Sequence, residues 1–197
     1  EHNVRFSQKE TSADTSIKQV AASMKKIPWV PGTRNLDLGG GKYDLGVEFL
    51  AGHGVESRVF DPFNRAPEHN AEVMAWAKQN PPDTVTVMNV LNVIDDDAAM
   101  ENVIRQAAEI VKPDGDVYFQ VYKADKPGKT AKGYQRAQDT REYIPYIRRH
   151  FQDVEVTKGY IVARMPLKPE AVDLGKTWFE SSVVRGIQNL TQSKGSG

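Results

Sequence analysis

Hydrophobic and polar residues follow two different spacings along this chain. Short apolar runs with many β-branched residues, typical of strands, are followed by stretches in which apolar residues recur every three or four positions, typical of helices. The strand-like runs end near Asp37, Phe60, Leu91 and Tyr122. The helix-like stretches between them lie at 45–53, 73–77 and 100–111. Strands and helices in this alternation predict an α/β fold with a doubly wound, mostly parallel sheet.

The pattern changes toward both ends of the chain. Residues 15–27 place their apolar side chains on one helical face, which predicts an N-terminal helix. A last helix of the core and two strand-like runs joined at Lys158-Gly159 predict a final antiparallel hairpin. Apolar residues at helical spacing over 168–190 predict a helical tail that packs on the domain or on a second subunit. We therefore expect one domain, with its core at about 34–165.

Composition limits the classes of function. Of 197 residues, 39% are hydrophobic and 26% charged, as in an ordinary globular domain. Without cysteine the chain has neither disulfides nor a thiolate ligand or nucleophile. No apolar run is long enough for a membrane span and the four histidines are scattered, so we expect a cytoplasmic protein without a metal site. Basic and acidic residues both number 26, so net charge predicts no polyanionic partner.

The stretch that carries the chemistry is Arg34-Asn35-Leu36-Asp37-Leu38-Gly39-Gly40-Gly41. Three glycines between a strand and a helix let the backbone turn tightly and approach a ligand, and the helix start offers free N–H groups. A dinucleotide fingerprint has a further glycine where this chain has Asp44. Carboxylates here would repel a pyrophosphate and suit an ammonium or sulfonium charge. Asp61 ends the next strand, 61 − 39 = 22 residues after Gly39, which is the place of an acid that holds a ribose.

These residues resemble motif I of the class I S-adenosylmethionine (SAM) dependent methyltransferases, an acidic residue followed by a glycine-rich loop. The similarity runs to Arg164 and includes the turn Lys112-Pro113-Asp114-Gly115, where the family usually has two glycines. It implies SAM as the cofactor and in-line transfer of its methyl group. The interval from Asp61 to Thr84 has room for one helix only, so we expect the family's third strand to be missing.

The resemblance also implies roles for residues at the strand ends. The methionyl part of SAM would be held by Asp37, Gly39, Gly40 and Gly41, and the ribose by Asp61. Local candidates for the adenine wall are Pro62, Phe63 and Met88. Asn89 would line the pocket toward adenine or substrate. No residue is an evident general base, and the residues that would orient the methyl acceptor are Asn89, Asn92 and Tyr122.

Residues 123–149 differ from the rest of the chain in charge. They carry eight lysine and arginine residues against three acids, with tyrosines among them. A mobile basic loop at 126–133, at the ligand-binding edge of the sheet, would suit a nucleotide or nucleic-acid acceptor. The alternative is a solvated connection without a role. Three classes stay open: a methyltransferase for nucleotide-bearing substrates, one for small molecules or proteins, and a non-catalytic SAM-binding module that binds a partner through its tail helix.

Overall fold

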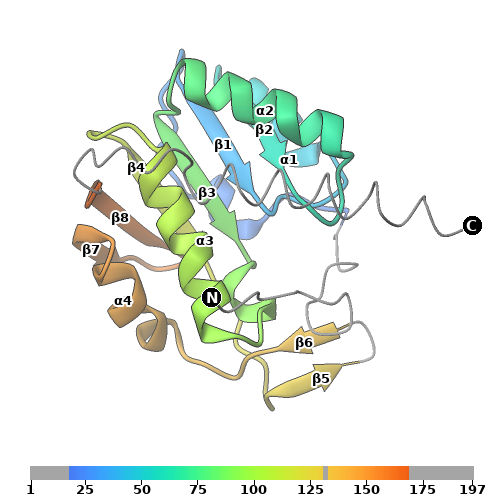
Figure 1. Cartoon of the computed structure of the whole chain (residues 1–197), viewed down its shortest axis with the longest axis vertical. Helices are drawn as coiled ribbons and strands as arrows, with labels where there is room; N and C mark the ends of the chain where they lie inside the picture. Colours follow the sequence, from blue (N-terminus) through green and yellow to red (C-terminus); the bar gives the residue numbers. More distant parts are fainter. Residues whose placement is uncertain (1–17, 131–132, 169–197) are drawn as a thin grey trace, which may run out of the picture.

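The computed structural model describes residues 18–130 and 133–168 and shows an α/β fold (Figure 1). A six-stranded sheet is covered by helices, and a separate two-stranded hairpin follows its β4 strand. The strands are β1 Arg34–Leu38, β2 Glu56–Phe60, β3 Thr84–Met88, β4 Asp116–Gln120, β5 Gly128–Thr130, β6 Gly133–Gln135, β7 Phe151–Val156 and β8 Ile161–Pro166. The helices are α1 Leu45–Ala51, α2 Pro67–Gln79, α3 Asp97–Ile110 and α4 Thr140–Arg148, with the 3₁₀ turns η1 Ala22–Lys25 and η2 Leu91–Val93.

The strand order β2-β1-β3-β4-β8-β7 confirms the predicted doubly wound sheet. Strands β2, β1, β3 and β4 are parallel, whereas β8 runs antiparallel to both β4 and β7, as expected for the final hairpin. In the part of the chain that is described, no strand lies outside β2. The third strand of the family is therefore missing there, and helix α2 alone fills the interval between β2 and β3.

Helix α2 covers the sheet edge that the missing strand leaves open. His69 Nε2 lies 2.8 Å from the carbonyl oxygen of Val59. The side-chain amide of Asn70 accepts the Asp61 N–H at 3.1 Å and donates to the Asp61 carbonyl at 2.9 Å. An edge strand otherwise presents a row of unpaired backbone groups. Side chains of α2 thus satisfy backbone groups that a neighbouring strand would have paired.

The two faces of the sheet differ in chemistry. The main core lies between the sheet and α2, α3 and α4, which lie together on one face (Figure 1). Leu36 and Leu38 of β1 belong to this core, so Asn35 and Asp37 face the other side, because side chains alternate along a strand. There Asn35 Nδ2 donates hydrogen bonds of 3.1 Å to hydroxyl groups of β2 and of Thr86 in β3. A buried polar row therefore leads along this face to the Asp37 carboxylate.

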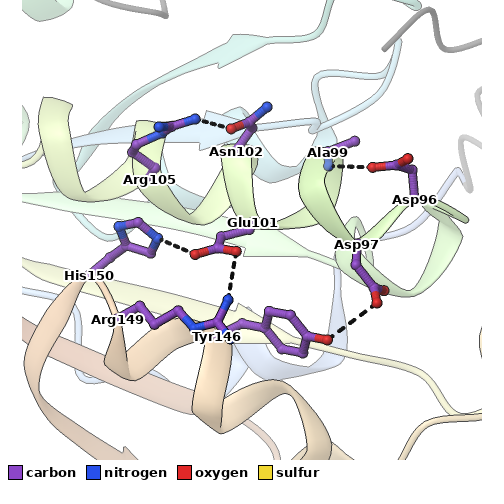
Figure 2. A network of polar contacts seen from close by, with 9 residues as sticks. All are labelled: Asp96, Asp97, Ala99, Glu101, Asn102, Arg105, Tyr146, Arg149 and His150. Atoms are coloured by element: carbon purple, nitrogen blue, oxygen red, sulfur yellow. Dashed lines mark hydrogen bonds and ion pairs between the residues drawn. The ribbon is translucent and has the colours of Figure 1, made fainter. Parts of the chain in front are cut away.

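Helix α4 and the β5–β6 hairpin are held against α3 by ionic contacts. Glu101 of α3 accepts from Arg149 at 2.9 Å and lies 3.1 Å from His150 Nε2 (Figure 2). Asp97, in the first turn of α3, pairs at 2.7 Å with Arg136, the residue after β6. Basic residues of the segment 123–149 thus take part in packing the domain.

The predicted helix over 15–27 is wrong in the part that can be compared. Within residues 18–27 only the short turn η1 forms. The Ser23 N–H, which a helix over 15–27 would bond to a carbonyl four residues earlier, instead donates to Gln120 Oε1 at 2.9 Å. A contact across the sheet therefore replaces local helical bonding.

The loop expected at 126–133 is corrected to a hairpin, because β5 and β6 pair as antiparallel strands. Its mobility stays a prediction. The base of this hairpin is closed by a bond of 3.1 Å from the Ala124 N–H to the Arg136 carbonyl. Residues 131–132 are outside the described part of the chain. The predicted tail helix over 168–190, with its expected role in oligomer contacts, falls outside it from residue 169 on.

Candidate active site

The carboxyl ends of four parallel strands meet at one edge of the sheet. There β1 leads into Gly39, β2 into Asp61, β3 into Asn89 and β4 into Val121. Strands β1 and β3 are neighbours, but the chain leaves β1 toward β2 and leaves β3 toward β4, so the winding reverses between them. Open α/β sheets bind their ligands at such a reversal. The fold therefore gathers most of the predicted site residues where a ligand is expected.

The glycine loop has no room for side chains. Gly39 and Gly41 have left-handed φ angles of +74° and +79°. A Cβ at Gly39 would stand 2.7 Å from Val90 Cγ2, and a Cβ at Gly40 would stand 2.4 Å from Asp37 Oδ2. Such distances are shorter than non-bonded atoms tolerate. The loop thus packs directly against the ends of β1 and β3, and its backbone forms one wall of the site.

We expect Gly39→Ala to lower the free energy of unfolding by about 3 kcal/mol. The left-handed conformation costs about 1–2 kcal/mol for a residue with a Cβ, and overlap with Val90 adds about 1–3 kcal/mol. Gly32→Ala is the matched control, because Gly32 has a φ of +83° but a Cβ there meets nothing within 4 Å. Urea unfolding of both variants measures the difference. Equal losses in the two variants would contradict a tightly packed loop.

Asp37 is a buried carboxylate without an ion pair among the described residues. Its Oδ1 accepts a hydrogen bond of 2.9 Å from Thr86 Oγ1. Burial, with a smaller contribution from the charge of Asp61, raises the pKa of Asp37 to about 6, although Thr86 and Arg65 oppose the shift. Burial disfavours the charged form, and a nearby cation restores it. The site therefore has the chemistry to attract an ammonium group.

Asp61 is saturated by donors of the chain itself. Its carboxylate accepts backbone N–H groups of Gly41 (2.9 Å), Phe63 (2.9 Å) and Asn64 (3.0 Å), and also Asn64 Nδ2 (3.1 Å). An ionised carboxylate offers about four lone-pair sites, and all are used here. Asp61 thus ties the glycine loop to the turn after β2. A ribose hydroxyl would have to replace one of these donors, so its role on the ribose stays a prediction.

Arg65 is a site residue that sequence reasoning missed. Its guanidinium donates to the carbonyl oxygens of Gly41 (2.7 Å) and Tyr43 (3.0 Å), and it pairs with Asp44 at 2.8 Å. Asp44, expected to face a ligand, is therefore already paired. The one sequence signal for Arg65 is its place four residues after Asp61, in the turn that follows β2. Asp61 accepts the Gly41 N–H and Arg65 donates to the Gly41 carbonyl, so both residues hold the glycine loop through Gly41.

Asn89 follows β3 with a left-handed φ of +57°, which asparagine tolerates better than most residues. Its N–H donates to the Gln120 carbonyl at 2.8 Å, and its Oδ1 accepts from Gln120 Nε2 at 3.2 Å. Met88 is buried in the smaller apolar cluster, where Ser23 Oγ lies 2.9 Å from its sulfur. Asn89 thus stands at the ligand edge, and Met88 packs beneath the N-terminal segment.

The other predicted site residues have different surroundings. Pro62 and Phe63 lie exposed on the turn after β2, which leaves them accessible to a ligand. Tyr122 has 59% of its surface exposed. Asn92 is buried, and its Nδ2 donates to Gln135 at 3.1 Å while its carbonyl accepts the Arg136 N–H at 2.8 Å. Asn92 therefore holds the β5–β6 hairpin, and its predicted contact with a methyl acceptor, like that of Tyr122, stays a prediction.

The described residues, 18–130 and 133–168, contain no group of three or more His, Cys, Asp or Glu side chains that could hold a metal ion. No helix among them is long and apolar enough to cross a membrane.

The sheet is doubly wound, with an acid near the end of β1, a tight glycine loop after it and a second acid after β2. These features define a nucleotide-binding α/β protein of the class I methyltransferase type. A family model described as a methyltransferase domain matches residues 10–178. The chain therefore belongs to this family of SAM-dependent methyltransferases. No curated protein sequence matches it at a significant level.

Two solved structures agree at the level of the fold, and a third is a weaker match. TnmH is 19% identical, with a TM-score of 0.51 over 73% of this chain and 52% of its own. The Burkholderia thailandensis 1,6-didemethyltoxoflavin N1-methyltransferase is 18% identical, with a TM-score of 0.50 over 69% of this chain and 72% of its own. A phosphoethanolamine N-methyltransferase 2 of Haemonchus contortus is 18% identical, with a TM-score of 0.47 over 66% of this chain, which spans only 35% of that protein.

Proposed function

We propose that the protein binds SAM between the ends of β1 and β3 and transfers its methyl group to a small-molecule acceptor. When bound, SAM supplies an electrophilic methyl group on a positively charged sulfur. The observation that carries the proposal is the buried Asp37 carboxylate beside a loop that only glycine can form. The ammonium group of the methionyl part would give Asp37 the charged partner that it lacks among the described residues. Calorimetric titration with S-adenosylhomocysteine (SAH) tests this half of the proposal.

Each residue around the loop has a distinct task in this account. Asp61 and Arg65 hold the glycine loop in place, and Asp37 binds the cationic end of the cofactor. Phe63, 39% exposed on the turn after β2, would pack on the adenine. Asn89 faces the acceptor from the end of β3. Methyl transfer needs little more than such positioning, because a near-attack geometry lowers the barrier by itself.

The small acceptor is favoured over a nucleic acid by the charges of segment 123–149. Three of its basic residues are paired within the domain: Lys123 with Asp139, Arg136 with Asp97 and Arg149 with Glu101. Arg136 is also buried, so it offers no charge to a polyanion. Fewer cations remain for phosphate contacts than the sequence count of eight indicates. Basic residues of this segment therefore stabilise the domain, and fewer of them are left to bind a polyanion.

Binding to an oligonucleotide tests whether the acceptor is a small molecule or a nucleic acid. We expect no salt-dependent binding of single-stranded or duplex DNA or RNA in fluorescence anisotropy, and no difference between the wild type and a Lys126→Ala, Lys129→Ala, Lys132→Ala variant. Tight binding by the wild type would instead support a nucleic-acid acceptor, if the triple variant reduces the slope of log affinity against log salt concentration by the equivalent of up to about three phosphate contacts. Lys123→Ala is the matched control, because the Lys123 ammonium already pairs with Asp139.

A further inference from the structure

Gln120, the last residue of β4, connects the N-terminal segment to Asn89 at the ligand edge of the sheet. Its Oε1 accepts the backbone N–H of Ser23 at 2.9 Å, and its Nε2 donates to Asn89 Oδ1 at 3.2 Å. Its backbone carbonyl accepts the Asn89 N–H at 2.8 Å. One residue thus holds Asn89 at two points, in a left-handed conformation.

These bonds decide which way two side-chain amides face. An amide can present its oxygen or its nitrogen, and its hydrogen-bond partners determine which. The Ser23 backbone N–H can only donate, so Gln120 must meet it with oxygen. Gln120 then has only its NH₂ group left for Asn89, and Asn89 must meet that group with oxygen. The NH₂ group of Asn89 remains, without a hydrogen-bond partner among the described residues.

We propose that Asn89 presents N–H donors to the methyl acceptor, so that the site selects acceptors with a lone pair on oxygen or on a ring nitrogen over primary amines. This inference rests on the proposed function. An enzyme that grips a target amine at this position needs an oxygen there, because the N–H groups of an amine are donors. Gln120 and Ser23 are positioning residues that act through Asn89 and need not touch the acceptor.

The polarity of Asn89 also suits a site in which no described residue is an evident general base. An N–H donor stabilises an ionised oxygen, so a phenol or acid can bind as its anion. In the transfer the S–CH₃ bond breaks and an O–CH₃ bond forms. The sulfonium becomes a neutral thioether and the oxygen loses its negative charge. The acceptor has given its proton to solvent before the transfer, so no proton has to leave during it. A primary amine, in contrast, would have to lose a proton after it is methylated.

Gln120→Glu reverses this polarity without a change in any residue that faces the acceptor. At pH 8 both carboxylate oxygens accept hydrogen bonds, so Ser23 keeps its partner and Asn89 must turn its NH₂ group toward position 120. We expect ¹⁵N NMR of the ligand-free protein to show the Asn89 NH₂ exchanging freely with solvent in the wild type. In Gln120→Glu its exchange should slow by about tenfold, as a hydrogen bond of ordinary strength requires.

Gln120→Met is the matched control, because methionine is similar in length and neither donates nor accepts strongly. In Gln120→Met the Asn89 NH₂ group should exchange with solvent as fast as in the wild type. An Asn89 NH₂ that is already protected in the wild type, or that stays unprotected in Gln120→Glu, would overturn the proposal. This measurement needs no ligand, so it stands whether or not the protein binds SAM.

Methyl transfer to 5-hydroxyindole and 5-aminoindole, from SAM with a labelled methyl group, supplies a second readout. We expect the wild type to prefer the hydroxyl compound, and Gln120→Glu to shift the ratio toward the amine by about tenfold, the effect of one hydrogen bond. Preference of the wild type for the amine, or a ratio that Gln120→Glu leaves unchanged, would contradict the inference. If neither compound is methylated, the result counts against the proposed activity, and the NMR exchange rates alone decide the polarity of Asn89.

Discussion

Asp61→Ala is expected to lower the free energy of unfolding by about 3–4 kcal/mol, because it leaves three backbone N–H donors without their acceptor and each lost partner costs about 1 kcal/mol or more. The donors belong to Gly41, Phe63 and Asn64, and the carboxylate that they share is buried. Binding of SAH should weaken by at least about tenfold in the same variant, since the glycine loop loses one of its two supports.

Urea unfolding and calorimetry separate the two effects. Asp61→Asn keeps one oxygen acceptor but turns an NH₂ group toward at least one of the donors, so its loss of stability should be intermediate. Asp125→Ala, which removes an exposed acid, should change neither quantity. If Asp61→Ala unfolds like the wild type and still loses SAH affinity, Asp61 is a ligand residue and its bonds within the chain contribute little.

Asp37→Asn should stabilise the protein and weaken cofactor binding together. Burial raises the pKa of Asp37 from 3.8 to about 6, and each pKa unit corresponds to about 1.4 kcal/mol. Removal of this buried charge should therefore increase the free energy of unfolding at pH 7.5 by up to about 3 kcal/mol. SAH would lose a charge-assisted contact, which corresponds to roughly 10–100-fold weaker binding. A variant that loses both stability and affinity would contradict this account of Asp37.

The pKa of Asp37 also predicts how the free energy of unfolding of the wild type changes with pH. Between pH 3.8 and about 6 the folded protein keeps a proton on Asp37 that the unfolded chain has released. The contribution of Asp37 to stability therefore falls as pH rises through this window and is constant above it. SAH affinity should change in the opposite direction, because only ionised Asp37 attracts the ammonium group. Calorimetry from pH 7.5 to pH 5 should show weakening in the wild type and a flat profile in Asp37→Asn.

The fold could be predicted because its signals are local. The β-branched run of β3 and the acids at the ends of β1 and β2 stand out within a few residues of sequence. The absence of the family's third strand could be predicted from the length of the interval between Asp61 and Thr84, which holds one helix only. The glycine loop could be located for the same reason, and its tight packing is what three consecutive glycines imply.

What the sequence did not reveal depends on residues far apart in the chain. Ser23 and Gln120 are separated by 97 positions, and Asn92 and Gln135 by 43. The helical spacing of residues 15–27 is a local signal, but the contact of Ser23 with β4 outweighs it. The same holds for the basic segment 123–149. Its charges can be counted from the sequence, but the ion pairs that it forms with α3 cannot be predicted from it. Such long-range hydrogen bonds decide what the polar residues of the site do.

The most direct test of the central claim is calorimetric titration of the wild-type protein with SAH and, separately, with NAD at pH 7.5. The buried Asp37 carboxylate beside the glycine loop suits a cationic ligand and opposes a pyrophosphate. We therefore predict saturable binding of SAH that Asp37→Asn weakens, and no measurable binding of NAD. Tighter binding of NAD than of SAH would contradict the assignment of this site to SAM.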